Sequence, residues 1–398
     1  MPVAHARVPV VPARLDPRRS AFVGAGREGL PRLRSRAFPP RPLAPRAPMA
    51  SSTPSPLLGA MDPAIVGDRG PLHVRTPLLL SQPMSAALGR DVYIKLDALQ
   101  PSGSFKLRGI GYACQAAVRR GATTLVSSSG GNAGLAVAYS GQRLGAPVAV
   151  VVPETTPEFI RDRLRSYEAD VIVHGSQWSE ANAEAERVAE RLNGALVHPF
   201  EGETTWIGHA TVIHEIADDL AALGAPPDRI RPSAVVTCVG GGGLLAGVLR
   251  GLREVGWGDD VLAVAAETTG ADSLATSLDR DEVSTLPGIA SVAKSLGAAS
   301  PSPAVFEMCR GNPMVASWRV SDADAVEACA KFADDHRVLV EPACGAALAA
   351  VYSGKCDALN AGTIGEGPVV VEVCGGAIID RATLDAYCEQ FGVARGGG

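Results

Sequence analysis

Residues 101–109 read PSGSFKLRG and place Lys106 between a loop of small residues and the start of a predicted helix. Only five lysines occur in the chain, against 32 arginines, so arginine supplies most of the positive charge. An amine forms a Schiff base with a carbonyl group and a guanidinium does not, so a lysine kept in this background indicates amine chemistry. First helical turns favour acidic residues, which disfavours an ordinary structural lysine here. We therefore expect Lys106 to be chemically active.

Short β-branched runs alternate with longer amphipathic runs on both sides of this stretch. The predicted strands are 92–96, 123–127, 148–152, 171–173, 234–239, 261–266 and 369–373. The predicted helices are 105–119, 132–144, 157–167, 178–192, 204–223, 243–254 and 380–391. Such alternation is typical of parallel sheets covered by helices. We predict an α/β protein with two open, twisted lobes and a cleft between them.

Glycine is concentrated where three of the predicted strands end. The sequences are SSSGGNAG at 127–134, GGGGLLAG at 240–247 and CGG at 374–376. The first two open predicted helices, where free backbone N–H groups and the helix dipole favour an anion. We therefore expect two anion sites. The alternative is that glycine only allows a tight turn between strand and helix.

The four-glycine loop also fits a dinucleotide-binding fingerprint. Gly241, Gly243 and Ala246 match G-x-G-x-x-G/A, and Glu267 closes the next strand. Glu267 lies 26 positions after the first of these glycines, where about 20 is usual. A phosphate cradle of backbone N–H groups fits the loop at least as well. An NAD-dependent oxidoreductase remains the alternative from a different class.

The overall composition excludes several classes of partner. The 398-residue chain is 46% hydrophobic and 20% charged, and its formal net charge is −5. It has no uncharged apolar run of about 18 residues that could span a bilayer, and it lacks the broad basic field that non-specific nucleic-acid binding requires. The eight cysteines include no C-x-x-C pair and the seven histidines no H-E-x-x-H, which disfavours zinc and disulfide scaffolds. We expect no membrane and no nucleic acid as partner.

Residues 1–60 differ from the rest in composition. They hold ten arginines, twelve of the 30 prolines, no lysine and only two acidic residues. The remaining residues carry 27 basic against 40 acidic side chains. An arginine-rich, acid-poor start without an apolar core is typical of an organellar transit peptide, and a disordered tail is the alternative. We expect a plastid or mitochondrial location if this leader acts in targeting, and a cytoplasmic one otherwise.

Four motifs in order resemble those of pyridoxal-phosphate (PLP) enzymes with the tryptophan-synthase β-like fold, called fold type II. They are PSGSFKLRG at 101–109, the loop at 240–243, EPACGAA at 341–347 and CGG at 374–376. Over about residues 70–395 the chain resembles the serine dehydratase-like branch of the serine/threonine dehydratases. We assign a large PLP-binding lobe to 61–99 and 209–398 and a small lobe to 100–208. The resemblance also implies a homodimer.

The resemblance implies roles for the residues around the cofactor. Lys106 would attach PLP as a Schiff base and then act as the base that removes the substrate Cα proton. Phe105 would pack against the ring, and Asn132 would bond its 3′-oxygen. Cys374 would face the pyridine nitrogen, where a neutral thiol suits β-elimination better than chemistry with a long-lived carbanion. The phosphate would be held by Gly240, Gly241, Gly242, Gly243 and Leu244.

The serine-containing loop would receive the substrate carboxylate at a helix N-terminus. The residues implied are Ser129, Gly130, Gly131, Asn132 and Ala133, with Ser129 also counted as catalytic. Serine racemases, which have a similar lysine motif, carry a serine before their Gly-Asn pair, at the position of Gly130. Glycine has no side chain to donate a proton, so racemisation is disfavoured. A wider pocket beside Gly130 is expected to hold the substrate loosely.

The implied activity is that of an L-serine ammonia-lyase. Loss of the Cα proton and the β-hydroxyl gives aminoacrylate, which hydrolyses to pyruvate and ammonia, and L-threonine would give 2-oxobutanoate as a secondary reaction. The alternatives left open are a threonine-preferring dehydratase, a serine racemase-like enzyme and a PLP-binding protein without turnover. The resemblance also allows a monovalent cation such as K⁺ near Glu267 and Ala271.

Overall fold

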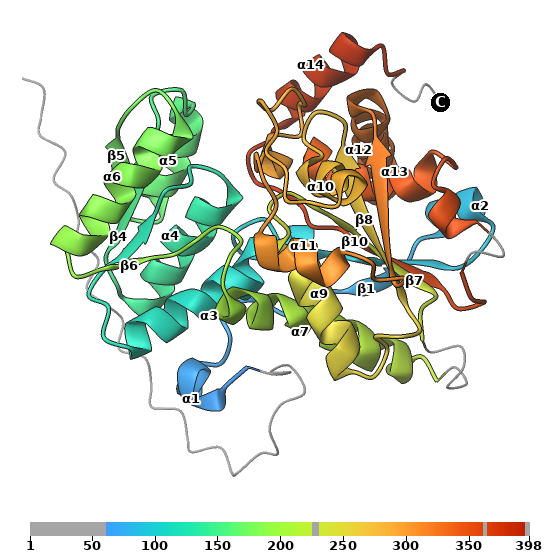
Figure 1. Ribbon diagram of the computed structural model, residues 1–398, viewed down its shortest axis with the longest axis horizontal. Coiled ribbons are helices and arrows are strands. Elements are labelled where there is room, and N and C mark those ends of the chain that lie inside the picture. The colour runs from blue at the N-terminus through green and yellow to red at the C-terminus, as the bar shows by residue number, and fades with distance from the viewer. Residues whose placement is uncertain (1–60, 225–230, 361–363, 395–398) are drawn as a thin grey trace, which may run out of the picture. The chain divides into compact units, whose positions relative to one another are not determined.

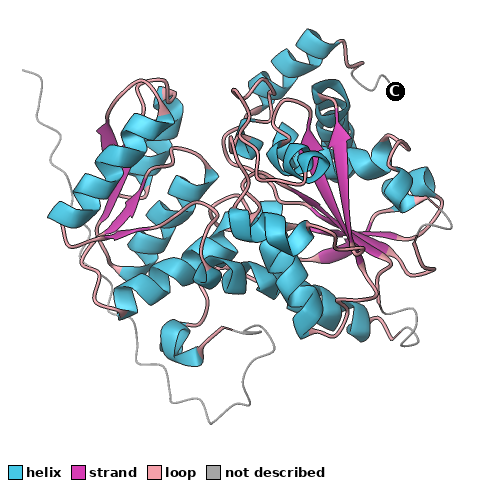
Figure 2. Ribbon diagram, viewed as in Figure 1, coloured by secondary structure: helices cyan, strands magenta, loops and turns pink. Residues whose placement is uncertain are grey.

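The computed structural model describes residues 61–224, 231–360 and 364–394. The chain divides into residues 1–52 and 53–398, and every described residue belongs to the second unit. The predicted leader, residues 1–60, therefore lies outside the described residues. Two sheets organise the described part of the chain, and helices cover both of them (Figures 1 and 2).

The larger sheet has six strands in the order β1-β2-β10-β7-β8-β9. All neighbours run parallel except β1, which pairs antiparallel with β2. Every residue of β10 and β7 is buried, as expected for central strands of a parallel sheet covered on both faces. The strands are β1 (Leu78–Leu80), β2 (Val92–Lys95), β7 (Ala234–Cys238), β8 (Leu262–Thr268), β9 (Val315–Val320) and β10 (Val369–Glu372).

The smaller sheet has four parallel strands in the order β5-β4-β3-β6. They are β3 (Leu125–Ser127), β4 (Val148–Val152), β5 (Asp170–Val173) and β6 (Ala195–Leu196). All strands of this sheet fall within residues 100–208, and those of the larger sheet within 61–99 and 209–398. The lobe boundaries themselves stay a prediction.

The helices connect the strands and pack on the faces of the two sheets (Figure 2). The helix α7 packs against both α3 and α9, so it links the start of the smaller lobe to the larger one. The helices are α1 (Pro63–Val66), α2 (Gln82–Leu88), α3 (Lys106–Arg119), α4 (Asn132–Leu144), α5 (Glu158–Ser166), α6 (Trp178–Arg191), α7 (Glu203–Ala222), α9 (Gly243–Glu254), α10 (Ser273–Arg280), α11 (Pro303–Cys309), α12 (Asp322–His336), α13 (Pro342–Tyr352) and α14 (Arg381–Phe391).

Every strand and helix predicted from the sequence is present, with ends within two residues of those expected. The sequence missed β1, β6, β9, α1, α2, α10, α11, α12 and α13. Two of these strands have only three and two residues, too short for a periodic pattern. The sequence of α13 is PACGAALAAVY, and nearly every residue is buried, so it has no polar face to give a helical period.

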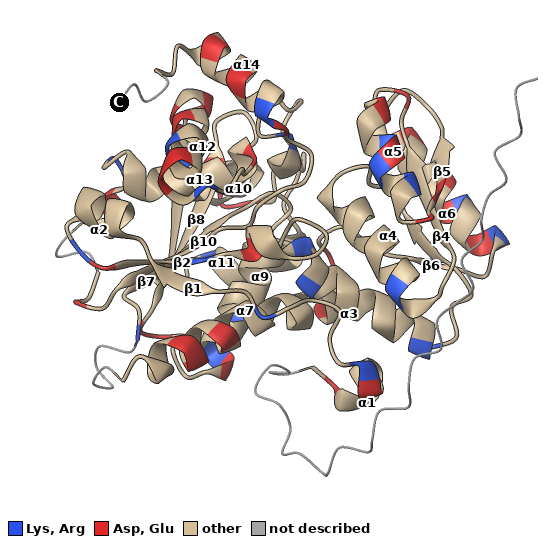
Figure 3. Cartoon of the chain, turned by 180° about the vertical axis from the view of Figure 1, so that it is seen from behind, with Lys and Arg blue, Asp and Glu red and all other residues tan. Residues whose placement is uncertain are grey.

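Charged side chains of both signs share the outer helices. Figure 3 shows basic and acidic positions together on α5 and on α6. Among residues 61–224, 231–360 and 364–394, no helix combines the length and the hydropathy needed to cross a bilayer. All eight cysteines are buried and none forms a disulfide.

A buried ionic cluster joins α3 to β2 and α7. The fully buried Arg108 donates from Nε to Asp97 Oδ2 at 2.6 Å and from Nη1 to Glu215 Oε1 at 2.7 Å. Lys95, also fully buried, places Nζ 2.7 Å from Glu215 Oε2. Burial alone would raise the pKa of Glu215, but the charges of Arg108 and Lys95 outweigh it and lower this pKa to about 2. Glu215 is therefore ionised, and the hydrogen bonds of Arg108 to Glu215 and Asp97 fix the first turn of α3.

We expect Arg108→Gln to lower the free energy of unfolding by about 3–5 kcal/mol, because it leaves two buried carboxylates without their main counter-charge. Urea unfolding followed by circular dichroism measures the change. Arg310→Gln is the matched control, since it removes an arginine from an exposed pair with Asp281, where ion pairs contribute little. Equal losses in the two variants would contradict the role given to the cluster.

Candidate active site

Lys106 is the first residue of α3, and its amine is held by the main chain of another segment. Its Nζ donates to the carbonyl oxygen of Pro199 at 2.7 Å. Burial lowers the pKa of Lys106 to about 8, although the thiols of Cys238 and Cys374 act in the opposite direction. With that pKa, roughly one amine in ten is neutral at pH 7. Lys106 therefore offers a nucleophilic amine under ordinary conditions.

The loop before Lys106 pairs with the segment that follows β10. Ser104 and Gly375 form an antiparallel bridge, and the N–H of Phe105 donates to the carbonyl oxygen of Cys374 at 3.1 Å. Gly375 has a φ of 80°, and a Cβ there would lie 2.5 Å from the Cα of Ala98, so only glycine fits. Two motifs that are far apart in the sequence therefore form one main-chain unit.

Three buried thiols gather at the end of β7 and β10. Cys238 donates to the Sγ of Cys374 across 3.3 Å. Hydrogen bonds with Cys238 and Cys344, together with burial, raise the pKa of Cys374 well above its usual range. Cys374 is therefore a neutral thiol, and it cannot supply the negative charge that an aspartate would offer to a pyridine nitrogen.

The four-glycine loop between β7 and α9 presents free main-chain donors. No acceptor among the described residues takes a hydrogen bond from the N–H groups of residues 240–243. A Cβ on Gly241 would lie 2.4 Å from the ring of Phe200, and one on Gly242, where φ is 94°, would lie 2.7 Å from Val305. Glycine thus lets Phe200 and Val305 pack closely against the loop, while the loop N–H groups stay free at the N-terminus of α9. This arrangement fits a phosphate group, and Leu244 anchors it in the core.

The serine-containing loop forms a second set of free donors before α4. The hydroxyl of Ser129 accepts the N–H of Gly131 at 3.2 Å. A Cβ on Gly134 would lie 1.8 Å from the carbonyl oxygen of Ser129, so the tight turn requires glycine. Donors at a helix N-terminus suit a carboxylate. The N–H groups of Gly130, Asn132 and Ala133 have no acceptor among the described residues.

The space beside Gly130 differs from what the sequence suggests. A Cβ at this position would lie 3.0 Å from Thr156 Cγ2 and 3.1 Å from Val152 Cγ1. The Cβ direction is therefore filled by two side chains, and the expected widening of the pocket is absent there. Alanine would fit only if these neighbours shifted by a few tenths of an ångström.

Glu341, directly before α13, connects Asn132 to the larger lobe. Its Oε1 accepts the Nδ2 proton of Asn132 at 3.0 Å and the N–H of Ile378 at 2.9 Å, and its Oε2 accepts the hydroxyl of Ser295. Asn132 also donates to Ser295 Oγ at 3.2 Å and accepts the N–H of Ala377 at 2.8 Å. Every polar atom of this amide is engaged. A bond from Asn132 to a cofactor oxygen therefore requires one of its N–H groups to exchange partners.

Glu267 and Ala271 lie at the end of β8, next to α10. The two carboxylate oxygens of Glu267 accept the N–H groups of Leu274 at 3.0 Å and Ala275 at 2.8 Å. Burial raises the pKa of Glu267 to about 8. Across the described ranges there is no group of three or more His, Cys, Asp or Glu side chains suited to a metal ion. A cation site built from carbonyl oxygens stays a prediction.

The remaining predicted site residues form one connected region. The N–H of Phe105 donates to the carbonyl oxygen of Cys374, whose thiol accepts from that of Cys238. Gly240 lies against the main chain of residues 295–296, and the side chain of Ser295 accepts a hydrogen bond from Asn132. The sequence assigned no role to four residues of this region. Two of them could have been found from the sequence, because Glu341 opens the EPACGAA motif and Cys238 closely precedes the glycine loop. The other two could not. Pro199 acts through its main-chain carbonyl group, and Ser295 lies in an irregular loop, so no sequence pattern marks either residue.

Residues 71–375 match the family model described as "Pyridoxal-phosphate dependent enzyme". The chain belongs to this family, whose cofactor fits the structure: a lysine amine of lowered pKa lies beside a neutral thiol, and a glycine cradle presents free N–H donors. The predicted fold type and cofactor are thereby confirmed. The dinucleotide interpretation of the glycine loop is wrong, because the same loop belongs to the PLP fold.

Several relatives of the chain carry the name of serine dehydratase. The chain is 46% identical over 325 residues to "Serine dehydratase-like" of Mus musculus, covering 81% of this chain and 96% of the relative. It is 43% identical to "L-serine dehydratase/L-threonine deaminase" of Homo sapiens, with 81% and 97% covered. A fungal L-serine ammonia-lyase from Rhizomucor miehei has a solved structure with 36% identity and a TM-score of 0.73, covering 80% and 99%. The chain is thus a PLP-dependent lyase of the serine dehydratase branch.

We expect cofactor attachment to follow the ionisation of Lys106. Below pH 8 the rate constant for PLP binding to the cofactor-free protein should rise about tenfold per pH unit, since only the neutral amine attacks a carbonyl, and it should level off above pH 8. Burial lowers the pKa of both nearby histidines, His198 and His209, below 6.5, so they are neutral in this range. Stopped-flow absorbance measures the rate. A rise that continues to pH 10.5 would contradict the lowered pKa.

We expect Glu341→Gln to weaken PLP binding roughly tenfold. The amide oxygen can still accept from Asn132 and Ile378, but the amide NH2 replaces the oxygen that accepts the Ser295 hydroxyl, so Ser295 and its contact with Asn132 must rearrange. Fluorescence titration of the cofactor-free protein measures the dissociation constant. Glu307→Gln, on the exposed side of α11, is the control and should leave binding unchanged. Unaltered affinity in the Glu341 variant would show that the contact is not needed for the cofactor.

Proposed function

We propose that this chain deaminates L-serine to pyruvate and ammonia and converts L-threonine to 2-oxobutanoate in a secondary reaction. The observation that carries the proposal is a lysine amine of lowered pKa in the same connected region as two helix N-termini whose N–H groups lack acceptors among the described residues. The curated relatives named for serine dehydratase and threonine deaminase support it, as does the similarity to the fungal ammonia-lyase.

Each end of the site has its own part in this proposal. Residues 240–243 bind the cofactor phosphate through main-chain N–H groups, and Lys106 attaches the cofactor. The loop at 129–133 binds the substrate carboxylate through its N–H groups and the hydroxyl of Ser129. PLP, when bound, supplies an electron sink for negative charge at the substrate Cα. Phe105 packs against the ring, and Asn132 orients it once one N–H is exchanged.

Lys106 also moves the proton in this proposal. Its neutral amine accepts the Cα proton, and the carbonyl oxygen of Pro199 stabilises and directs the resulting ammonium group. Loss of the β-hydroxyl then removes negative charge from the substrate. Cys374 remains a neutral thiol throughout, because its hydrogen bonds with other thiols and its burial oppose ionisation.

The absence of a side chain at Gly130 favours elimination over racemisation. A racemase needs a proton donor on each face of the Cα carbon, and Gly130 has no side chain to supply the second one. The chain is 25% identical to maize serine racemase, with a TM-score of 0.69. A threonine-preferring dehydratase would differ only in the ratio of kcat/KM for the two substrates, which steady-state kinetics determines.

The assembly and location of the chain form a further part of the proposal. We propose a homodimer, a large lobe of residues 61–99 and 209–398, and a small lobe of residues 100–208. The composition of residues 1–60 supports import into a plastid or mitochondrion, with the cytoplasm as the location if this segment does not act in targeting. A monovalent cation bound near Glu267 and Ala271 completes the proposal.

We expect Lys106→Ala to abolish both the visible absorption of bound PLP and the release of pyruvate from L-serine, because no other group in the site can attach the cofactor. A lactate dehydrogenase-coupled assay measures pyruvate. The exposed Lys331→Ala is the control and should retain both signals. Wild-type protein that binds PLP but releases no pyruvate would instead identify a cofactor-binding protein without turnover.

A further inference from the structure

His209 lies where α7 packs against both α3 and α9, and its side chain is completely buried. A Cβ on Gly109 of α3 would lie 2.6 Å from the Nε2 of His209, and one on Gly247 of α9 would lie 2.3 Å from its Cβ. Glycine inside a helix is unfavourable, so at His209 the close approach of the helices outweighs helix propensity. One of these helices begins at Lys106 and the other at the last glycine of the four-glycine loop. His209 therefore lies between the two helices that carry the main parts of the cofactor site.

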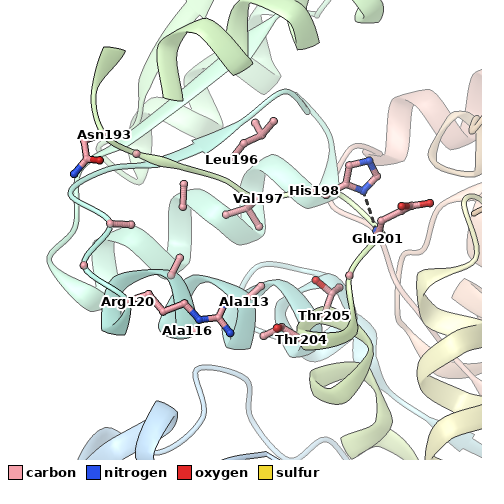
Figure 4. Close-up of a pocket in the computed structure, with 16 residues that line it drawn as sticks. Ala113, Ala116, Arg120, Asn193, Leu196, Val197, His198, Glu201, Thr204 and Thr205 are labelled. Carbon is pink, nitrogen blue, oxygen red and sulfur yellow. Dashed lines mark hydrogen bonds between the residues drawn. The ribbon is translucent and has the colours of Figure 1, made fainter. Parts of the chain in front are cut away.

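The ring of His209 has no hydrogen-bond partner in the part of the chain that the structure describes. Both Nδ1 and Nε2 are buried without one, although a neutral imidazole carries one donor and one acceptor. A surface pocket reaches Thr205, one turn earlier in α7, but His209 does not line it (Figure 4), so water in this pocket does not reach the ring nitrogens. Unmade hydrogen bonds in the interior are unfavourable. Folding alone would therefore favour an apolar side chain at this position.

The ring of His209 packs against the ring of Phe105. The two centroids are 5.0 Å apart and the planes are inclined by 47°, a separation at which aromatic rings attract each other. Burial, followed by the positive charges of Lys106 and Arg108, lowers the pKa of His209 well below its usual range, so the ring is neutral. The Nζ of Lys106 lies 5.1 Å from the centroid of the same Phe105 ring. His209 therefore reaches the reactive amine through one intervening side chain.

We propose that His209 is a positioning residue for the cofactor site: its ring supports Phe105 and thereby sets where Lys106 and the cofactor ring meet. The main chain of Phe105 is held by Cys374, so its ring is the part that still needs a support. An imidazole is aromatic yet smaller than a phenyl ring, which suits the narrow space beside Gly109. The inference rests on the packing of Phe105 against the cofactor ring, which belongs to the proposed function.

The same helix also supports the four-glycine loop. Trp206, on the turn of α7 before His209, donates from its indole N–H to the carbonyl oxygen of Phe200 at 2.9 Å. A Cβ on Gly241 would lie 2.4 Å from the ring of Phe200, so this ring lies directly against the loop. The helix α7 therefore contacts both sides of the cofactor site, through His209 toward the lysine and through Trp206 toward the four-glycine loop.

We expect His209→Met to raise the dissociation constant of PLP about fivefold, because methionine fills the space without an aromatic ring. Fluorescence titration of the cofactor-free protein measures this constant, and the visible absorption maximum of bound PLP should shift as well. Phe105→Leu should weaken binding more, and the double variant should bind like Phe105→Leu, because the ring of His209 acts only through Phe105. His214→Met is the matched control, since this ring lies on the same helix but pairs with Glu254 near the surface.

Urea unfolding of the cofactor-free protein separates positioning from a purely structural role. His209→Met should keep or raise the wild-type midpoint, because it removes two buried nitrogens that have no partner among the described residues. A lowered midpoint combined with wild-type PLP binding would overturn the proposal. Independent factors for the two substitutions in the double variant, or an unchanged absorption maximum, would overturn it as well.

A second variant, His209→Gln, keeps a polar side chain but has no ring. It should weaken PLP binding as much as His209→Met does, and it carries the same comparison if the methionine variant does not fold. Wild-type affinity in His209→Gln would assign the role to a nitrogen atom and would contradict support by the ring. None of these readouts needs turnover, so a chain that releases no pyruvate from L-serine would contradict the proposed function and leave this inference standing.

Discussion

The ionic cluster around Arg108 is the constraint on which the rest of the structure depends. Arg108, Asp97 and Glu215 come from three separate elements, and each is completely buried. A buried charge is stable only when its partners are in place, so α3, the end of β2 and α7 must assemble together. Lys106 stands two residues before Arg108. The position of the reactive amine is therefore set by a charge network outside the reaction site.

The surroundings of the expected cofactor ring are kept free of charge. Cys374 is held neutral by other thiols and by burial. Glu372, two residues earlier on β10, is fully buried with no partner for either carboxylate oxygen among the described residues, and burial raises its pKa well above the usual range. If the cofactor lies where we propose, these buried groups would leave its ring nitrogen without a counter-ion. This environment suits a reaction in which a leaving group removes the negative charge.

The sequence predicted those parts of the fold and site that depend on local pattern. Lys106, the glycine loop and the serine-containing loop each combine a strand end, a turn and a helix start, which neighbouring residues specify. The partners of these residues come from distant segments. Glu341 reaches Asn132 only through the tertiary fold, and Pro199 contributes a carbonyl group that every residue type carries. The helix α13 escaped prediction for a related reason, since burial on all sides removes amphipathic periodicity.

The contact between Lys106 and Pro199 has an evolutionary consequence. Because the acceptor is a main-chain oxygen, no exchange of the side chain at position 199 can delete it, and only a change in the path of the chain can move it. Proline narrows that path further by fixing its own φ angle. Inserting or deleting a single residue between His198 and Gly202 would therefore move this carbonyl oxygen away from Lys106, which a point substitution cannot do. In related enzymes, the length of this loop is expected to be under stronger selection than the identity of most of its side chains.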